Sequence, residues 1–193
     1  GIQNTLMGGL AGDALTTGDS NVALGYNAMG AADGSESRNV AIGHGTLATM
    51  NSDASNYNVA VGYEAGNDIT TGTKNTLIGG LVGDALTTGT RNVSLGYLAL
   101  SAEDTGSRNV AIGAEALLVA NNDASNYNTA VGDSAGESVS SGTQNTIIGG
   151  LAGDQLTTGD NNIIIGYAAA ASAVGVDNEI TLGDANISAF RCA

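Results

Sequence analysis

One five-residue motif recurs along the whole chain: asparagine, a β-branched residue, any residue, an aliphatic residue and glycine. Consecutive copies begin 17 to 19 residues apart, and an eleventh, degenerate copy begins at Glu179. A repeat of this length is one structural unit that buries its apolar side chains only by stacking on its neighbours. We therefore expect residues 1–193 to form a single repeat domain. The motif asparagines are Asn4, Asn21, Asn39, Asn58, Asn75, Asn92, Asn109, Asn128, Asn145 and Asn162.

Each unit predicts one turn of a parallel β-solenoid. Since alternate residues of a strand face the same way, we expect the β-branched and aliphatic positions to point inward. The position between them would then point outward, as for Leu6, Leu77, Ile147 and Ile164. Beyond the corner glycine, one column is mostly alanine. Four residues further, another is mostly apolar: Leu15, Met50, Ile69, Leu86, Val139, Leu156 and Phe190.

These columns predict two short strands per unit, joined by glycine corners. The expected fold is an all-β parallel β-solenoid, or β-roll, of about eleven rungs of 17–19 residues. Helix is disfavoured because the chain has 30 glycines and a β-branched column. With one phenylalanine and no tryptophan, the chain cannot fill the core of a conventional enzyme domain.

Charge and hydropathy limit the partners. The formal net charge of -14 would repel phosphate polymers, so we expect no nucleic-acid partner. No apolar run reaches the roughly 20 residues that cross a bilayer, so we expect no membrane insertion. Outward-facing aliphatic residues along a rod call for a partner surface, and self-association into a closed ring is the simplest solution. Periodicity does not fix the number of chains in that ring.

The motif asparagines predict a structural ladder. In a parallel stack, identical residues lie above one another at about 4.8 Å. An amide carries both a donor and an acceptor, so each side chain can bond the amides above and below it. We interpret this column as structural and not as a ligand site.

The tyrosines are the candidate receptor contacts. Tyr57 and Tyr127 end two matching inserts of the repeat, and four further tyrosines share one column with His44, just after the corner glycine. Exposed aromatic rings can stack on saccharides, but they can equally cover a corner or pack between chains. The four of that column are Tyr26, Tyr63, Tyr97 and Tyr167.

Most of the basic residues also share a column. Four of the five directly precede a motif asparagine, which indicates a structural role such as pairing with carboxylates of a neighbouring rung or chain. These residues are Arg38, Lys74, Arg91 and Arg108.

No catalytic constellation is visible, because one histidine and one cysteine occur without a nucleophile motif. The equivalent residues Asp13, Asp84 and Asp154 lie four units apart, too far to share a calcium ion within one chain. We expect no enzymatic activity, no cofactor and no metal site. Paired carboxylates leave a tailspike-like glycan hydrolase as an alternative.

The motif N-V-A-I-G, seen from Asn39 and Asn109 and followed by a short alanine-rich stretch, resembles the head repeats of trimeric autotransporter adhesins. That resemblance implies a left-handed β-roll and three chains around one axis, although the rungs here are longer. The last sixteen residues, 178–193, resemble the stretch before the self-cleaving intramolecular chaperone of phage tail fibres and tailspikes of the endosialidase type.

Together these resemblances imply an excerpt of a longer phage fibre protein, extracellular on the virion. As a homotrimer it would attach to a glycan or protein receptor of the host surface. The main alternative is the head of a bacterial surface adhesin, located on the bacterial cell surface.

Overall fold

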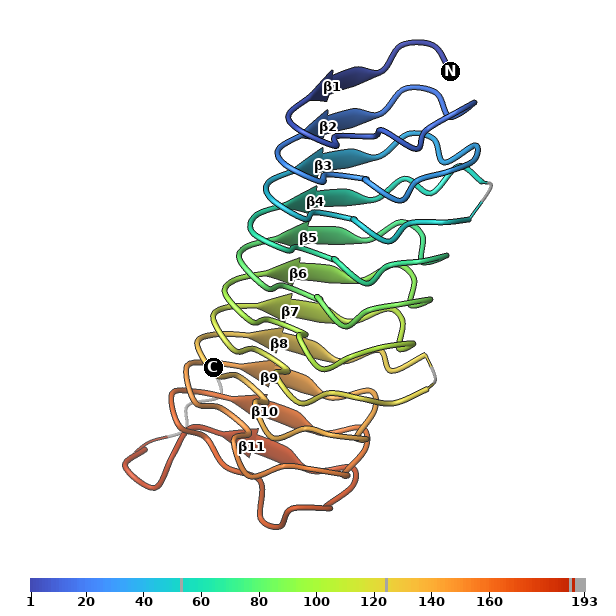
Figure 1. Ribbon diagram of the computed structural model, residues 1–193. Coiled ribbons are helices and arrows are strands. Elements are labelled where there is room, and N and C mark those ends of the chain that lie inside the picture. Colours follow the sequence, from blue (N-terminus) through green and yellow to red (C-terminus); the bar gives the residue numbers. More distant parts are fainter. Residues whose placement is uncertain (53, 124, 188, 190–193) are drawn as a thin grey trace.

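The chain forms a rod of stacked turns in the computed structural model, which describes residues 1–52, 54–123, 125–187 and 189 (Figure 1). The described residues contain eleven strands of three residues each and no helix, so they offer no helix able to cross a membrane. Phe190 lies outside them. The strands are β1 (Thr5–Met7), β2 (Val22–Leu24), β3 (Val40–Ile42), β4 (Val59–Val61), β5 (Thr76–Ile78), β6 (Val93–Leu95), β7 (Val110–Ile112), β8 (Thr129–Val131), β9 (Thr146–Ile148), β10 (Ile163–Ile165) and β11 (Ile180–Leu182).

All of these strands belong to one parallel sheet whose order is the chain order, β1 to β11. Each strand pairs with the next in register, so Val22 lies beside Val40 and Ala23 beside Ala41. The repeat therefore places the same motif position on every rung at the same point of the cross-section. The predicted parallel β-solenoid is confirmed.

The predicted direction of the strand side chains is wrong. The middle residue of each strand points inward: Leu77, Ile147 and Ile164 are fully buried. The flanking positions face solvent and are half-buried or exposed, with Ile78 at 40%. Alternation fixes only which residues share a face, and not which face is inside. Five of the eleven residues in the middle column are alanine, which suits the narrow interior. Leu6 also lies against an inward position, Gly12, although the first rung leaves it 42% exposed.

Side-chain size is balanced across the interior. The middle strand residue faces the position six residues later, and on most rungs a large residue in one place meets a small one in the other. Leu77 meets Gly83, where an added Cβ would lie 3.2 Å from a leucine methyl. On the next rung the buried Ser94 is combined with the buried Leu100. These rungs thereby keep a similar interior volume, which close packing requires. The rungs of Ala60 and Ala130 are small at both positions, and side chains of neighbouring rungs reach into them, as Leu77 does toward Gly66.

The expectation of a second strand in each unit is also wrong, because the rest of each unit consists of turns. Among the described residues, 24 non-glycine positions have φ between 49° and 65°, in the left-handed region. They fall in up to three columns per unit: the residue before the motif asparagine and the residues two and four after the corner glycine. Such repeated left-handed positions prevent an extended strand.

The motif asparagines lie in one column, but backbone groups are their main partners. The Asn92 backbone N–H donates to Oδ1 of Asn75 at 2.9 Å. Nδ2 of Asn75 donates to the carbonyl of Gly89, also at 2.9 Å. Direct bonds between amides occur on some rungs only, as from Asn162 to Asn145 at 3.1 Å. On most rungs the side chain thus bridges consecutive rungs and closes its own turn, whereas Nδ2 of Asn109 is buried without a hydrogen-bond partner among the described residues.

Candidate functional site

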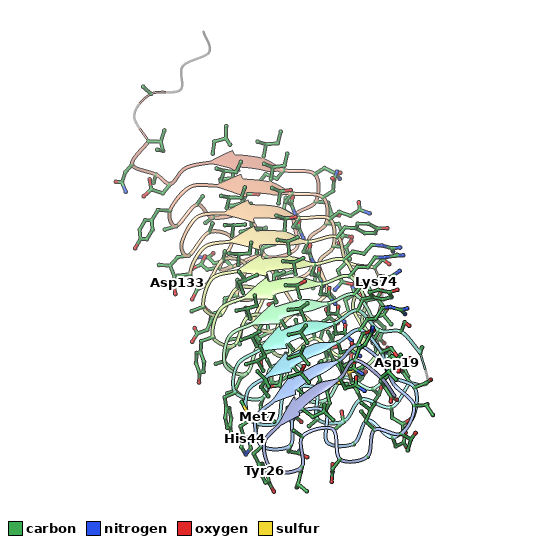
Figure 2. All side chains as sticks on the ribbon, turned by 90° about the horizontal axis from the view of Figure 1, so that it is seen from above. Met7, Asp19, Tyr26, His44, Lys74 and Asp133 are labelled. Carbon is green, nitrogen blue, oxygen red and sulfur yellow. The ribbon has the colours of Figure 1, made fainter. Side chains whose placement is uncertain are left out.

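The strands present a flat outer face bounded by two edges that carry different chemistry (Figure 2). Met7 lies on the strand face, Tyr26, His44 and Asp133 lie along one edge, and Lys74 lies along the other. The six tyrosines named from the sequence are divided between these edges. They therefore do not form one patch.

One edge carries a continuous column of cations and tyrosines over six consecutive rungs, which we call the basic stripe. Its members are the residues that directly precede the motif asparagines, and all have φ between 54° and 65°. Tyr57 and Tyr127 join it because each insert ends at this position, and both are about half exposed. The basic stripe is Arg38, Tyr57, Lys74, Arg91, Arg108 and Tyr127.

Two guanidinium groups of the basic stripe are held by the following rung. The Arg38 guanidinium lies 5.4 Å from the ring centroid of Tyr57, and its Nη1 donates to the hydroxyl of Ser55. Four rungs later, Arg108 lies 5.2 Å from the ring of Tyr127. It donates in the same way to a serine, Ser125. Cation–π contact and hydrogen bonding thus pre-orient both arginines.

No ion pair joins a cation of the basic stripe to a carboxylate within the described part of the chain. The neighbouring column explains how carboxylates are kept away. On rungs outside the stripe an aspartate accepts a hydrogen bond from the preceding rung, as Asp160 does from the Thr143 backbone N–H. On the Arg108 rung the same bond is accepted by the neutral Ser107 hydroxyl, from the Thr90 N–H at 2.9 Å. Sequence analysis expected carboxylate partners, and the described residues of this chain supply none.

The opposite edge carries the second aromatic column. Tyr26, His44 and Tyr63 form a continuous stack with ring centroids 5.3 Å apart. A Cβ placed at Gly80 would lie 3.6 Å from the Tyr97 ring, and one at Gly150 would lie 3.7 Å from Tyr167. Stacking therefore occupies the ring faces that Tyr26, His44 and Tyr63 turn toward one another.

The Glu64 carboxylate raises the pKa of Tyr63 by accepting its hydrogen bond and by its negative charge. The Tyr63 phenol therefore remains protonated at neutral pH.

Buried carboxylates anchor the two inserts. Glu36 accepts from the Ser52 backbone N–H at 2.8 Å at the start of the first insert. In the second, Glu103 accepts from Nδ2 of Asn126 at 2.8 Å and from the Gly106 N–H at 2.7 Å. Burial raises the pKa of Glu103, and these hydrogen bonds oppose that rise. The inserts are thus fixed where they deliver Tyr57 and Tyr127 to the basic stripe.

The strand face between the edges is apolar and uncovered. Its outward positions are valine, threonine, isoleucine, leucine and methionine along the whole sheet. Ile148 and Ile165 are 39% and 38% exposed. Parallel sheets are normally covered on both faces, so this face is unusual for a finished surface.

Sequence reasoning missed that Tyr57 and Tyr127 share a column with the basic residues. The signal was present, since each directly precedes a motif asparagine, as the four cations do. The inserts obscured it because they lengthen the two units concerned.

These features define a repetitive parallel β-solenoid with an uncovered apolar sheet, an aromatic edge and a basic, tyrosine-bearing edge. The described residues contain no group of three or more histidine, cysteine, aspartate or glutamate side chains that could hold a metal ion. No protein-family model, curated protein or solved structure matches the chain.

Proposed function

We propose that this chain is a structural and receptor-binding segment of a phage tail fibre, located on the virion and active in attachment to the host surface. Three copies, each wound left-handed, pack around one axis through their strand faces. The stack is then a stiff spacer that displays its edges to the host. The function is mechanical and adhesive and involves no catalysis.

The observation that carries the proposal is the uncovered apolar strand face. Burying apolar surface is the main driving force of protein association, at roughly 25 cal/mol per Å². A continuous face of valine, isoleucine and leucine on a parallel sheet is therefore a surface that another copy would cover. A closed ring of identical chains satisfies it without leaving an open, aggregating end.

Sedimentation equilibrium of the chain tests the assembly. We expect a species of three times the 18.9 kDa chain mass. Ile148→Lys places a charge on the strand face and should dissociate that species. Val119→Lys is the matched control, since Val119 is 41% exposed but lies outside the strands, and it should leave the trimer intact. A stable native monomer contradicts the proposal.

Binding of the labelled chain to cell surfaces tests the role. Attachment to a restricted set of bacterial strains supports the phage fibre. Attachment to animal cells or matrix proteins, with no bacterial binding, favours the adhesin head.

A further inference from the structure

We propose that the basic stripe binds an extended anionic polysaccharide, whose carboxylate or sulfate groups contact the cations while its sugar rings lie on the tyrosines. This inference rests on the proposed role in host attachment, since it names the class of receptor and the edge of the solenoid that contacts it.

The shape of the basic stripe favours a linear polymer. Six consecutive rungs at about 4.8 Å give a row roughly 24 Å long, parallel to the solenoid axis. No pocket is hollowed into the described part of the surface. A ligand here must lie along the surface, and an extended saccharide chain advances by about one sugar ring per rung.

The cations are free to bind an external anion. The chain holds 19 acidic residues against five basic ones, yet none of the four stripe cations has a carboxylate partner among the described residues. The residues directly preceding the stripe are neutral on all six rungs, whereas Asp19, Asp160 and Asp177 occupy that column on other rungs. Because serine and aspartate make the same bond in that column, folding alone does not exclude aspartate from the stripe.

The backbone gives an independent argument. Every stripe position is left-handed, where asparagine and glycine are the residues best tolerated. Outside the stripe the column does use asparagine, at Asn161 and Asn178. Arginine, lysine and tyrosine in this conformation cost stability. The fold requires this conformation on every rung but not these residue types, so their choice over asparagine or glycine on six consecutive rungs is a sign of function.

The side-chain chemistry selects a polysaccharide over a nucleic acid. Guanidinium groups match carboxylate and sulfate oxygens, and tyrosine rings offer an apolar face with a hydroxyl at its tip. Duplex DNA carries one charge per about 1.7 Å, a density that four cations in roughly 24 Å cannot match. The net charge of -14 would repel such a polymer strongly, whereas acidic saccharides carry fewer charges per length.

The basic stripe can remain open in a trimer. Arg38 bonds Ser55, which lies two residues before Tyr57 and so on the side away from β4. Arg108 bonds Ser125, on the corresponding side of Tyr127. The arginines therefore lean away from the strand face that the other copies would cover.

Affinity measurements with the 193-residue chain test the inference. The probes are polygalacturonate for carboxylates, heparin for sulfates, dextran as a neutral polymer and an oligothymidylate. We expect binding to polygalacturonate or heparin that weakens between about 50 and 200 mM salt, and none to dextran. The variant Lys74→Asn with Arg91→Asn should lower the affinity about tenfold, since it removes two charge-assisted contacts at positions that accept asparagine.

The control is Ala114→Glu with Val119→Glu, which has the same net charge but changes the opposite edge and an exposed site beyond it. It should bind within about twofold of the native chain. The inference is overturned if neither anionic polysaccharide binds, if the asparagine variant binds as well as the control, or if oligothymidylate binds more tightly than both. It is also overturned if the asparagine variant loses the trimer, because the stripe is then a contact between chains.

These outcomes are separable from the proposed function. A native chain that is trimeric but binds no anionic polysaccharide leaves the fibre role standing and removes only the ligand. A native monomer that binds polygalacturonate through Lys74 and Arg91 contradicts the trimeric fibre role and leaves the ligand assignment standing.

Discussion

The motif asparagines and the basic stripe are adjacent in sequence on the rungs that they share, yet they differ in burial, in side-chain partners and in how much the residue type varies. Asn92 is buried, and its side chain has two backbone partners: Oδ1 accepts from the Asn109 N–H, and Nδ2 donates to the Gly106 carbonyl. Arg91, one residue earlier, is exposed, and its side chain has no partner among the described residues. The first column keeps one residue type for ten rungs, whereas the second contains glutamine, serine, arginine, tyrosine, lysine and asparagine.

The difference shows where the fold dictates a residue and where it dictates only a conformation. At the ladder column the architecture needs an amide, because a buried N–H and a buried carbonyl depend on it. At the stripe column it needs only a left-handed residue. The choice of arginine, lysine or tyrosine there must therefore be explained by something outside the fold of the single chain.

The largest effect is expected in the interior. Leu77→Ala should lower the free energy of unfolding by about 2–5 kcal/mol, since it leaves a cavity opposite Gly83. Adding Gly83→Leu recreates the arrangement of the next rung, a small residue with Leu100, and should recover more than half of that loss. Gly83→Leu alone should destabilise, because its Cβ would lie 3.2 Å from Leu77. Denaturant unfolding of the four chains checks this. If the double variant instead loses the sum of what the two single variants lose, the size balance described for the interior is contradicted.

Asn92→Ala should come next, at about 2–4 kcal/mol. It leaves the Asn109 backbone N–H and the Gly106 carbonyl without their partners, at about 1–3 kcal/mol for each orphaned group. Arg91→Ala in the same rung removes no buried partner and should cost far less. Equilibrium unfolding of the two variants compares the two columns directly. Equal losses of unfolding free energy would show that the fold depends on both columns alike.

Glu103 is a buried group that titrates. Burial raises the pKa of Glu103 in the folded chain, so folding favours the protonated form. Relative to Glu103→Gln, the native chain should therefore gain thermal stability as pH falls from 7, and the gain should level off below the ordinary value of 4.5. Melting curves from pH 4 to pH 7 measure it, with Asp133→Asn as the exposed control. A difference that is independent of pH would show that burial does not control this carboxyl.

The smallest effect is expected at the stripe itself. Arg91→Gly relieves a left-handed arginine and should raise the free energy of unfolding by about 0.5–1 kcal/mol. Thr73→Gly, at a position without positive φ, should lower it by about 0.5–1 kcal/mol. Thermal unfolding of the two variants and the native chain measures both changes. If both substitutions destabilise alike, arginine is not strained here and the backbone argument for the stripe fails.

The sequence was sufficient to predict how the rungs stack, but not which side chains point into the interior of each rung. Strand positions and in-register pairing follow from the spacing of the motif, and Ala28 of the alanine column and Ile69 of the apolar column are both buried. The inward and outward faces of the strands were reversed, because both alternating sets are apolar and alternation alone cannot rank them. Alanine at Ala41, Ala60 and Ala111 was the signal, since only small residues fit the interior beside Leu47 or Leu117.

The sequence predicted columns for the candidate tyrosines but not which side chains they contact. Tyr26 and Tyr63 were placed correctly in one column, where they stack through His44. The meeting of Tyr57 with Arg38 depends on how the insert returns to the column, which the carboxylate of Glu36 helps to fix from inside. Such a path is set by tertiary contacts and cannot be derived from the motif spacing.

The bonds between rungs all run along the solenoid axis, as in the pairing of β5 with β6. Tension applied to the two ends of one chain would therefore act on the rungs in series, so the weakest would open first and the others would stay closed. Most rungs hold 17 residues, and each opened rung releases about 60 Å of extended chain. A single chain should thus lengthen in many small, similar steps, and so absorb a sudden pull without losing the whole rod at once.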